Sequence, residues 1–238
     1  GVCIQTGRRF TGLDRKADCL LVNTDREEIP CRFLINCGGL QCDRIAQKCG
    51  IEAGIRIVPF RGEYYKIAPG RRYLVKNPIY PVPSPDFPFL GVHFTRLIDG
   101  GIEAGPNAVL AFRREGYRKT DFSLKDTVDT LTYPGFLRLA ARYWKTGLGE
   151  MYRSMNRSAF ARALGRLVPE IRRGDLVPGG AGVRAQALTP EGRLLDDFHI
   201  LADRKSIHVL NAPSPAATAS MSIGKLVAGV AVRRFELA

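Results

Sequence analysis

The stretch RFLINCGGLQCDRIAQKCG, residues 32–50, predicts the fold class of the chain. Its first five residues form a short, mainly apolar run, which is typical of a buried strand. Cys37, Gly38 and Gly39 then form a turn, and apolar side chains recur afterwards at helical spacing until Gly50 supplies a stop signal. A strand, a glycine turn and a helix in this order make up half of an α/β unit. We therefore expect an α/β (α+β) fold.

Outward from this stretch, the chain divides into three zones. Residues 1–56 contain a second buried-strand pattern, CLLVN, at Cys19–Asn23. Residues 57–180 begin with extended segments rich in aromatic and β-branched side chains and continue with basic amphipathic helices. Residues 181–238 return to strands and end in a long helix. This order predicts an α/β domain, built from the first and third zones, that is interrupted by a mixed-sheet-plus-helices domain at residues 57–180.

Local signals mark a hairpin and three helix starts. Asp99-Gly100-Gly101 has the composition of a turn between two strands. Ser123 with Asp126 resembles a capping box, and Ser214 with Pro215 predicts the N-cap and first residue of the final helix. For the helix that begins at Pro134, we expect one apolar face formed by Phe136, Ala140, Tyr143 and Trp144.

The charge of the chain is strongly positive: 36 Lys and Arg residues against 23 Asp and Glu residues give +13. Residues 112–173 hold 14 basic and 6 acidic residues, a local net charge of +8. Basic helix faces of this kind are either solvated surface or a surface that associates peripherally with anionic membrane lipids. We do not expect nucleic acid as a partner, because no nucleic-acid-binding motif accompanies the charge. No apolar run reaches the roughly 18 residues that span a bilayer.

All six cysteines lie within the first 49 residues, and no two are spaced C-x-x-C. The three histidines follow far downstream, so zinc-site spacing is absent and we predict no metal site. Several of the cysteines sit within apolar strand patterns, which favours reduced thiols in an intracellular protein. We expect a cytoplasmic location, with the inner face of the cytoplasmic membrane as the alternative.

The loop NAPSPAAT, Asn211–Thr218, is the most informative candidate binding site. Small side chains fill it and the helix start that follows, so a flat ligand can approach the backbone closely. A helix start also offers unpaired N–H groups and partial positive charge, which suit the electron-rich edge of a reduced flavin. The alternative is a tight loop that packs without a ligand, and the same alternative holds for the glycine turn. The candidate cofactor-binding residues are Cys37, Gly38, Gly39, Asn211, Ala212, Pro213, Ser214, Pro215, Ala216, Ala217 and Thr218.

Four further residues are candidates for substrate chemistry. Arg184 stands in an apolar stretch, where a guanidinium binds a carboxylate bidentately or pairs with an acidic side chain of the chain itself. His93 has a near-neutral pKa suited to accepting a hydroxyl proton, although a structural histidine fits the same strand pattern. Arg61 either holds a second carboxylate or pairs with Glu63. Tyr80 completes the predicted substrate-binding set.

Six stretches, in order along the chain, resemble the L-2-hydroxyglutarate oxidase/dehydrogenase family of FAD-dependent, D-amino-acid-oxidase-like flavoproteins. The resemblance implies a Rossmann-like FAD-binding domain with a substrate cap, and oxidation of L-2-hydroxyglutarate to 2-oxoglutarate by hydride transfer to the flavin, with oxygen or a membrane quinone as the electron acceptor. It also implies that Arg184 binds the carboxylate of this small dicarboxylate substrate, and that residues 37–39 and 211–218 contact FAD. The stretches are LINCGG (34–39), PFRGEY (59–64), FLGVHFT (89–95), GPNA (105–108), AGVRAQ (181–186) and NAPSPAAT (211–218).

One element of the family pattern is absent. The family begins with a strand and a G-x-G-x-x-G turn that cradles the pyrophosphate of FAD, and the sequence contains no such motif. We therefore expect an incomplete FAD-binding domain whose first βαβ unit precedes Gly1. Two alternatives stay open: a related FAD oxidoreductase of amino acids or glycerol 3-phosphate, and a basic membrane- or nucleic-acid-binding module without catalysis.

Overall fold

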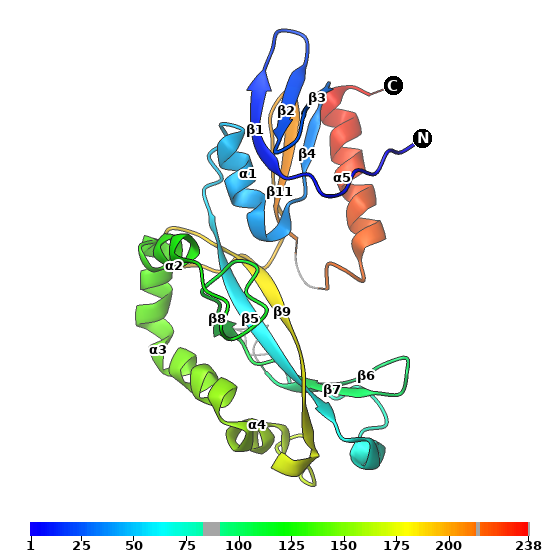
Figure 1. The fold of residues 1–238 in the computed structure, drawn as a ribbon, viewed down its shortest axis with the longest axis vertical. Coiled ribbons are helices and arrows are strands. Elements are labelled where there is room, and N and C mark those ends of the chain that lie inside the picture. Colours follow the sequence, from blue (N-terminus) through cyan, green and yellow to red (C-terminus); the bar gives the residue numbers. More distant parts are fainter. Residues whose placement is uncertain (83–90, 213–214, 238) are drawn as a thin grey trace. The chain divides into compact units, whose positions relative to one another are not determined.

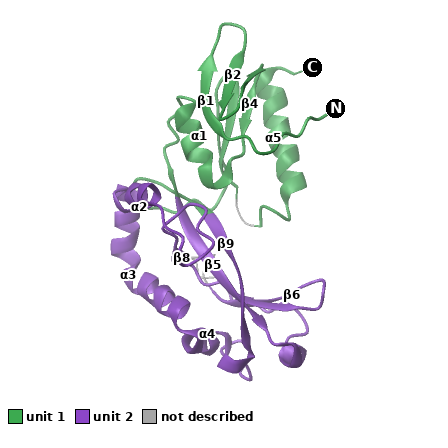
Figure 2. Cartoon of the chain, in the orientation of Figure 1, with its two compact units in different colours: residues 1–57, 185–238 green, residues 58–184 purple. Residues whose placement is uncertain are grey.

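The computed structural model describes residues 1–82, 91–212 and 215–237. The chain forms two compact units, which Figure 2 shows in different colours. Unit 1 comprises residues 1–57 and 185–238, and unit 2 comprises residues 58–184. Unit 2 is therefore a single insertion in unit 1. The observed divisions follow residues 57 and 184, where the sequence predicted them after 56 and 180.

In its described part, unit 1 combines two three-stranded sheets with two α-helices (Figure 1). The helices are α1 (Cys42–Lys48), which follows a 3-10 turn at Gly39–Gln41, and α5 (Ser220–Phe235). One sheet is an antiparallel meander of β1 (Phe10–Arg15), β2 (Leu20–Thr24) and β3 (Glu28–Cys31). The other sheet has the order β10 (His199–Ala202), β11 (Ser206–Asn211) and β4 (Leu34–Asn36). Because β4 and β11 run parallel, their carboxyl ends lie at the same edge of this sheet.

The core of unit 1 lies on both sides of the parallel strands. Ile207 on β11 packs with Ala231 and Phe235 of α5. A second buried cluster joins α1 to strands from both ends of the chain; it contains Cys42, Ala46, Ile57, Ala187 and Leu210. The strand, glycine turn and helix predicted from residues 32–50 are therefore present, and α1 forms part of this core. The strand is not buried as predicted, because Ile35 is 42% exposed.

Unit 2 is built on a five-stranded sheet (Figure 1). Strands β6 and β7 form the antiparallel hairpin that the sequence predicted around Asp99–Gly101. The sheet has the order β6 (His93–Arg96), β7 (Ile102–Gly105), β5 (Arg56–Ile67) and β8 (Val109–Leu110), and the long strand β9 (Leu176–Leu188) also pairs with β5. Its helices in the described part are α2 (Leu124–Leu131), α3 (Pro134–Met155) and α4 (Arg157–Leu164).

Helix α4 packs on one face of this sheet. Phe160 and Leu164, both fully buried, meet side chains of β6 and β7. The ring of Tyr65 on β5 approaches the ring of Phe160 edge-on, with the centroids 4.8 Å apart. Other members of this core are Ile67, Phe94, Ile102, Ala104 and Leu176. The mixed α/β class predicted for the chain is confirmed by this arrangement.

The capping box predicted for α2 is half formed, because the Ser123 N–H donates to the Phe112 carbonyl and not to Asp126. Ser123 accepts a hydrogen bond from the Asp126 N–H at 3.3 Å and so caps α2. On the predicted apolar face of α3, Phe136, Ala140 and Tyr143 are half-buried, and only Trp144, at 56%, is exposed. Tyr143 has non-helical torsion angles (φ −124°, ψ 24°), so the helix kinks there and its two halves do not share one continuous face. The buried positions of α3 are Gly135, Leu139, Glu150 and Ser154.

The final helix begins later than the sequence predicts. It starts at Ser220, and its N-cap residue, Ala219, provides no side-chain hydrogen bond. The Pro215 carbonyl accepts hydrogen bonds from the Thr218 hydroxyl (3.0 Å) and from the Ala219 N–H (3.1 Å). The Ala219 bond has the spacing of an α-helix, but the next N–H, that of Ser220, bonds to the Ala217 carbonyl three residues back, so residues 215–219 form turns and the regular helix begins only at Ser220. Ser214, the predicted N-cap, lies outside the described residues.

Two further sequence predictions concern the cysteines and the membrane. All six cysteines are free thiols, as expected. Across the residues that the structure describes, no helix combines the length and the apolar composition needed to cross a bilayer.

Candidate active site and cofactor-binding turns

The sheet of unit 2 has a second face, opposite α4, that carries polar side chains. Neighbouring residues of a strand point to opposite faces of a sheet. Phe94 and Tyr65 belong to the α4 side. Their strand neighbours therefore point the other way, and so does Glu103, which pairs with Thr95 across the strands. We call this side the polar face; it is formed by Tyr64, His93, Thr95 and Glu103.

Two of the predicted site residues, His93 and Tyr80, come together at the polar face. Their rings are stacked, with the centroids 4.2 Å apart and an interplanar angle of 22°. The Tyr80 hydroxyl also lies 3.2 Å from Thr95 Oγ1, within hydrogen-bond distance. Tyr80 is 60% exposed. The imidazole of His93 is therefore held in one orientation by a ring that is itself open to solvent in unit 2.

Arg184 is the third predicted residue in this neighbourhood. Burial lowers the pKa of His93 most strongly, a hydrogen bond with the Gly91 backbone opposes that effect, and the positive charge of Arg184 lowers the pKa further. The pKa of His93 therefore lies below its ordinary value, and the imidazole is neutral at neutral pH. A neutral imidazole beside a guanidinium can accept a hydroxyl proton while the guanidinium binds a carboxylate.

Tyr64 is a candidate site residue that the sequence analysis missed. Burial raises the pKa of its hydroxyl, and the charge of Arg184 opposes this rise, so the two side chains are close. The sequence does predict that Tyr64 and Tyr65 face opposite sides of the sheet, because they are neighbours on one strand. It does not predict which of them faces the core; that follows from the contact between Tyr65 and Phe160.

Arg61 pairs with Glu63, which the sequence analysis gave as the alternative to a substrate carboxylate. Its Nε and Nη2 donate to Glu63 Oε1 at 3.1 and 2.9 Å, and its Nη1 donates to the Arg118 carbonyl at 3.2 Å. The side chains of Arg61 and Glu63 are only 7% and 12% exposed. The structure thus places Arg61 in a buried ion pair, apart from the stacked rings of Tyr80 and His93.

Glu63 is the centre of this buried network. Its Oε2 accepts hydrogen bonds from Ser154 Oγ (2.7 Å) and Asn107 Nδ2 (3.2 Å), and Lys119 Nζ lies 3.3 Å away. Burial alone would raise the pKa of Glu63, but the hydrogen bonds from Ser154 and Arg61 and the charges of Lys119 and Arg61 outweigh burial and hold the pKa below its ordinary value. The network joins two of the sequence motifs, residues 59–64 and 105–108, in one structural unit.

The predicted cofactor-binding turns lie at the carboxyl ends of two neighbouring parallel strands in unit 1. Cys37–Gly39 follows β4, and Asn211 ends β11, which pairs with β4 in parallel. In open α/β sheets, ligands bind at this edge of the strands. Gly39 has a φ of +51°, and a Cβ atom there would meet nothing within 4 Å, so the turn presents open backbone. This arrangement fits the flat ring system and phosphates of FAD.

The residues of the second turn have distinct environments. The Asn211 side chain donates to the carbonyls of Asp197 (2.7 Å) and Leu195 (3.3 Å), so it holds the loop rather than a ligand. Pro215, Ala217 and Thr218 are exposed, while Ala212 and Ala216 are half-buried. Pro213 and Ser214 lie outside the described residues.

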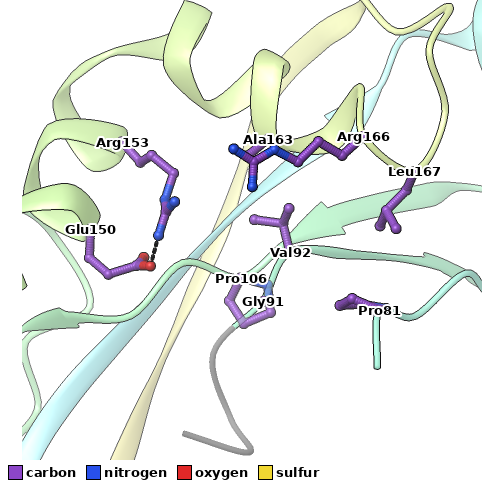
Figure 3. A pocket seen from close by; sticks show the side chains of 9 residues that line it. All are labelled: Pro81, Gly91, Val92, Pro106, Glu150, Arg153, Ala163, Arg166 and Leu167. Atoms are coloured by element: carbon purple, nitrogen blue, oxygen red, sulfur yellow. Dashed lines mark hydrogen bonds and ion pairs between the residues drawn. The ribbon is translucent and has the colours of Figure 1, made fainter. Parts of the chain in front are cut away.

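A small pocket lies on the α4 side of the unit 2 sheet (Figure 3). It measures about 160 Å³, and the guanidinium groups of Arg153 and Arg166 line it together with apolar side chains. Glu150 pairs with Arg153 and also accepts a hydrogen bond from the Ala108 N–H at 3.1 Å. Because Val92 of this pocket packs against the α4 core, the pocket lies on the opposite side of the sheet from His93.

Comparison with known proteins identifies the family. The family model for FAD dependent oxidoreductases, DAO, matches residues 1–230. The chain is 53% identical over 230 residues to an L-2-hydroxyglutarate dehydrogenase of Indibacter alkaliphilus, covering 96% of this chain and 58% of that protein. It is 46% identical over 215 residues to the L-2-hydroxyglutarate dehydrogenase of Escherichia coli strain K12, covering 90% of this chain and 51% of that protein. The chain thus spans about half the length of these relatives.

The fold is also found in a solved structure. Dithionite-reduced L-α-glycerophosphate oxidase of Mycoplasma pneumoniae with FAD bound superposes with a TM-score of 0.63 at 19% sequence identity, covering 97% of this chain and 50% of that one. At this identity the likeness supports the fold alone. The model match over residues 1–230 confirms the predicted flavoprotein superfamily: this chain belongs to the FAD-dependent oxidoreductase family.

Proposed function

We propose that this chain is part of an enzyme that oxidises L-2-hydroxyglutarate to 2-oxoglutarate with FAD as its cofactor. The observation that carries the proposal is the His93 imidazole at the polar face, stacked on Tyr80 with the centroids 4.2 Å apart, whose pKa is lowered by burial and by the positive charge of Arg184. An imidazole and a guanidinium are the groups needed to oxidise a 2-hydroxy acid. The similarity to L-2-hydroxyglutarate dehydrogenases favours this substrate over amino acids and glycerol 3-phosphate.

Each residue of the site has a separate role in this proposal. The two turns of unit 1 would hold FAD, which would supply a hydride acceptor for the substrate carbon. Arg184 binds the adjacent carboxylate, and the Tyr64 hydroxyl donates a hydrogen bond to the same group. His93 removes the hydroxyl proton, and Tyr80 keeps the imidazole oriented by stacking. Arg61 is assigned to the Glu63 network instead of the substrate, because its guanidinium is buried with that carboxylate.

FAD would be held by the two turns of unit 1. Cys37–Gly39 and the segment Pro215–Thr218 supply backbone and small side chains at one edge of the parallel strands. The first turn of α5 contains no acidic residue. The positive end of its helix dipole would therefore favour the electron-rich part of the reduced flavin.

The test measures reduction of bound flavin under anaerobic conditions in the protein that carries this chain. L-2-Hydroxyglutarate is expected to bleach the visible flavin absorbance, whereas amino acids and glycerol 3-phosphate leave it unchanged. His93→Ala should slow the reduction at least about 100-fold without loss of flavin, because general base catalysis contributes 10²–10⁴. The matched control is His199→Ala in unit 1, whose imidazole Nε2 lies 3.2 Å from the Ala53 carbonyl. An unchanged rate in His93→Ala would remove His93 from the mechanism.

The pH profile gives a second test of the same site. The rate should fall at low pH as His93 is protonated, and because its pKa is lowered, the fall should lie below about pH 6.5. Arg184 contributes to that lowering, so Arg184→Gln should move the fall to higher pH while it weakens substrate binding. A shift to lower pH would contradict the proposed proximity of the two side chains.

We further propose that the part of α3 after its kink at Tyr143 attaches the protein to an anionic membrane surface. In this part of α3, three apolar side chains are more than half exposed and recur at intervals of four and seven residues: Trp144 (56%), Leu148 (60%) and Met155 (73%). Basic residues accompany them, and Lys145 Nζ lies 5.6 Å from the Trp144 ring centroid. An apolar stripe flanked by cations is the pattern of a helix that lies in the membrane interface.

Sedimentation with lipid vesicles tests this attachment. The protein should bind vesicles rich in phosphatidylserine, bind phosphatidylcholine vesicles weakly, and dissociate at high salt. The double variant Trp144→Ser, Leu148→Ser should lose most of the binding. Met221→Ser is the control, because Met221 is 87% exposed but lies in unit 1. Equal binding by both variants would exclude this surface.

A further inference from the structure

A buried hydrogen-bond chain connects strand β11 to the Cys37–Gly39 turn. Asn36 and His208 lie opposite each other on the parallel strands β4 and β11 and are 3% and 0% exposed. Asn36 Nδ2 lies 3.1 Å from His208 Nδ1 and 2.8 Å from the Cys42 carbonyl oxygen. Asn36 Oδ1 accepts a hydrogen bond from the Gly38 N–H at 3.0 Å. One side-chain amide thus joins the imidazole, the turn and the start of α1.

Backbone groups fix the orientation of this amide, and the amide fixes the tautomer of His208. The Gly38 N–H can only donate and the Cys42 carbonyl can only accept, so Asn36 Oδ1 must face the first and Nδ2 the second. Nδ2 also faces His208 Nδ1, which must therefore accept and carry no hydrogen. The imidazole hydrogen is on Nε2, where it donates to Ser206 Oγ at 3.0 Å.

The surroundings of the imidazole keep it neutral. Burial lowers the pKa of His208 most, the negative charge of Asp203 opposes that effect, and the positive charge of Arg15 lowers the pKa further. Arg15 and Asp203 pair with each other at 2.5 Å, which limits the influence of either charge. On the α1 side, the Cys42 thiol donates to the Leu210 carbonyl at 3.4 Å.

We propose that His208 is a positioning residue for FAD: through Asn36, its neutral imidazole holds the Cys37–Gly39 turn in the shape that receives the cofactor. This inference rests on the assignment of that turn to FAD in the proposed function. The turn has little room to adjust, because a Cβ atom on Gly38 would lie 2.4 Å from Ile45 Cδ1 and 3.0 Å from Asn36 Oδ1. A change in the Asn36 amide is therefore transmitted to the backbone of the turn.

Protonation of His208 would break this arrangement. It would add a hydrogen to Nδ1, which would then face the NH2 group of Asn36, a donor opposite a donor. The amide could satisfy the imidazolium only by turning Oδ1 toward it. That rotation removes the acceptor from the Gly38 N–H and places NH2 beside it. The turn should therefore loosen, and FAD should bind less tightly, as the pH falls through the pKa of His208.

Two substitutions separate titration from packing. In His208→Asn, the amide oxygen can take the place of Nδ1 as an acceptor for Asn36, but it does not titrate. In His208→Leu, no acceptor remains. His199→Asn is the control. His199 lies on the neighbouring strand β10, and its ring is hydrogen-bonded to the Ala53 carbonyl and not to the Asn36 amide.

The first measurement is the dissociation constant of FAD between about pH 5 and pH 8. The wild-type protein and His199→Asn should bind FAD roughly five- to tenfold more weakly at the acid end, the effect of about one net hydrogen bond. His208→Asn should show little of this pH dependence. His208→Leu should bind weakly at every pH. The inference is overturned if His208→Asn keeps the wild-type profile.

The second measurement does not depend on FAD. Amide exchange at Gly38, corrected for its intrinsic rate, should accelerate in the wild type over the same pH range in which the ¹⁵N shifts of the His208 ring titrate, and should not do so in His208→Asn. Gly38 exchange that ignores the ring titration would overturn the inference even if FAD binds. A protein that binds no FAD but shows the coupled exchange would reject the proposed function while keeping the link between His208 and the turn.

Discussion

Glu63→Ala is expected to lower the free energy of unfolding by about 3–5 kcal/mol, the usual cost of removing one partner from a buried ion pair. The substitution leaves the guanidinium of Arg61, only 7% exposed, without its carboxylate. It also removes the acceptor of the Ser154 hydroxyl and the Asn107 amide. Urea unfolding would measure the loss.

The matched control for this prediction is Glu170→Ala, an exposed glutamate of the same unit. Its removal should change stability by less than about 0.5 kcal/mol. Equal losses at pH 7 for both substitutions would show that the network does not stabilise unit 2.

The stability of Glu63→Ala and of the wild type should also respond differently to acid. The pKa of Glu63 is lower in the folded protein than in the unfolded chain. The contribution of Glu63 to the free energy of unfolding is therefore complete above the unfolded-chain pKa, and it is lost as the pH falls through the folded-state pKa. The alanine variant should therefore lose less stability on acidification than the wild type.

Gly179→Ala is the second substitution with a large expected effect, a loss of about 3 kcal/mol, at the upper end of the range for overpacking. A Cβ atom at Gly179 would lie 2.6 Å from the Tyr64 carbonyl oxygen and 2.9 Å from its carbonyl carbon. These are backbone atoms of the paired strand β5, so relief requires that β5 and β9 move apart. Because Tyr64 is in the candidate site, the same variant should also weaken substrate binding.

Gly180→Ala provides the comparison from the adjacent position of the same strand. A Cβ atom at Gly180 would meet nothing within 4 Å. Alanine restricts the unfolded chain more than glycine, so this variant should be neutral or up to about 1 kcal/mol more stable. Thermal and urea unfolding of the pair give the difference directly. If the two variants were equally stable, the close approach of β9 to Tyr64 would be wrong.

Features set by local sequence were predictable, and features set by distant contacts were not. The strand and helix within residues 32–50 depend on a single apolar pattern, and their presence and order were predicted correctly. The local pattern allowed either a substrate or Glu63 as the partner of Arg61, whereas Glu63 also binds Ser154, which is 91 positions away along the chain. No local pattern contains that contact.

Two errors have conformational causes. The apolar face of α3 was predicted from an unbroken helical period, whereas the helix kinks at Tyr143. The start of α5 was predicted from Ser214 and Pro215, which are typical of a helix start, but the Ser220 N–H bonds to the Ala217 carbonyl three residues back, and the regular helix begins only at Ser220. Propensity identifies the residues that favour a helix start but cannot decide between competing local hydrogen bonds.

The insertion of unit 2 leaves and re-enters unit 1 at neighbouring points. Strands β5 and β9 are paired, and Ile57 and Ala187, near the two crossings, share one buried cluster. The gap that an inserted segment must close is therefore short, whatever its length, and closure of a longer loop costs little additional entropy. A lineage can thus exchange the whole block between the crossings, and with it the shape and charge offered to a substrate, while the strands that precede the two turns keep their register. Substitutions in residues 58–184 can therefore change this inserted unit without altering the two turns of unit 1.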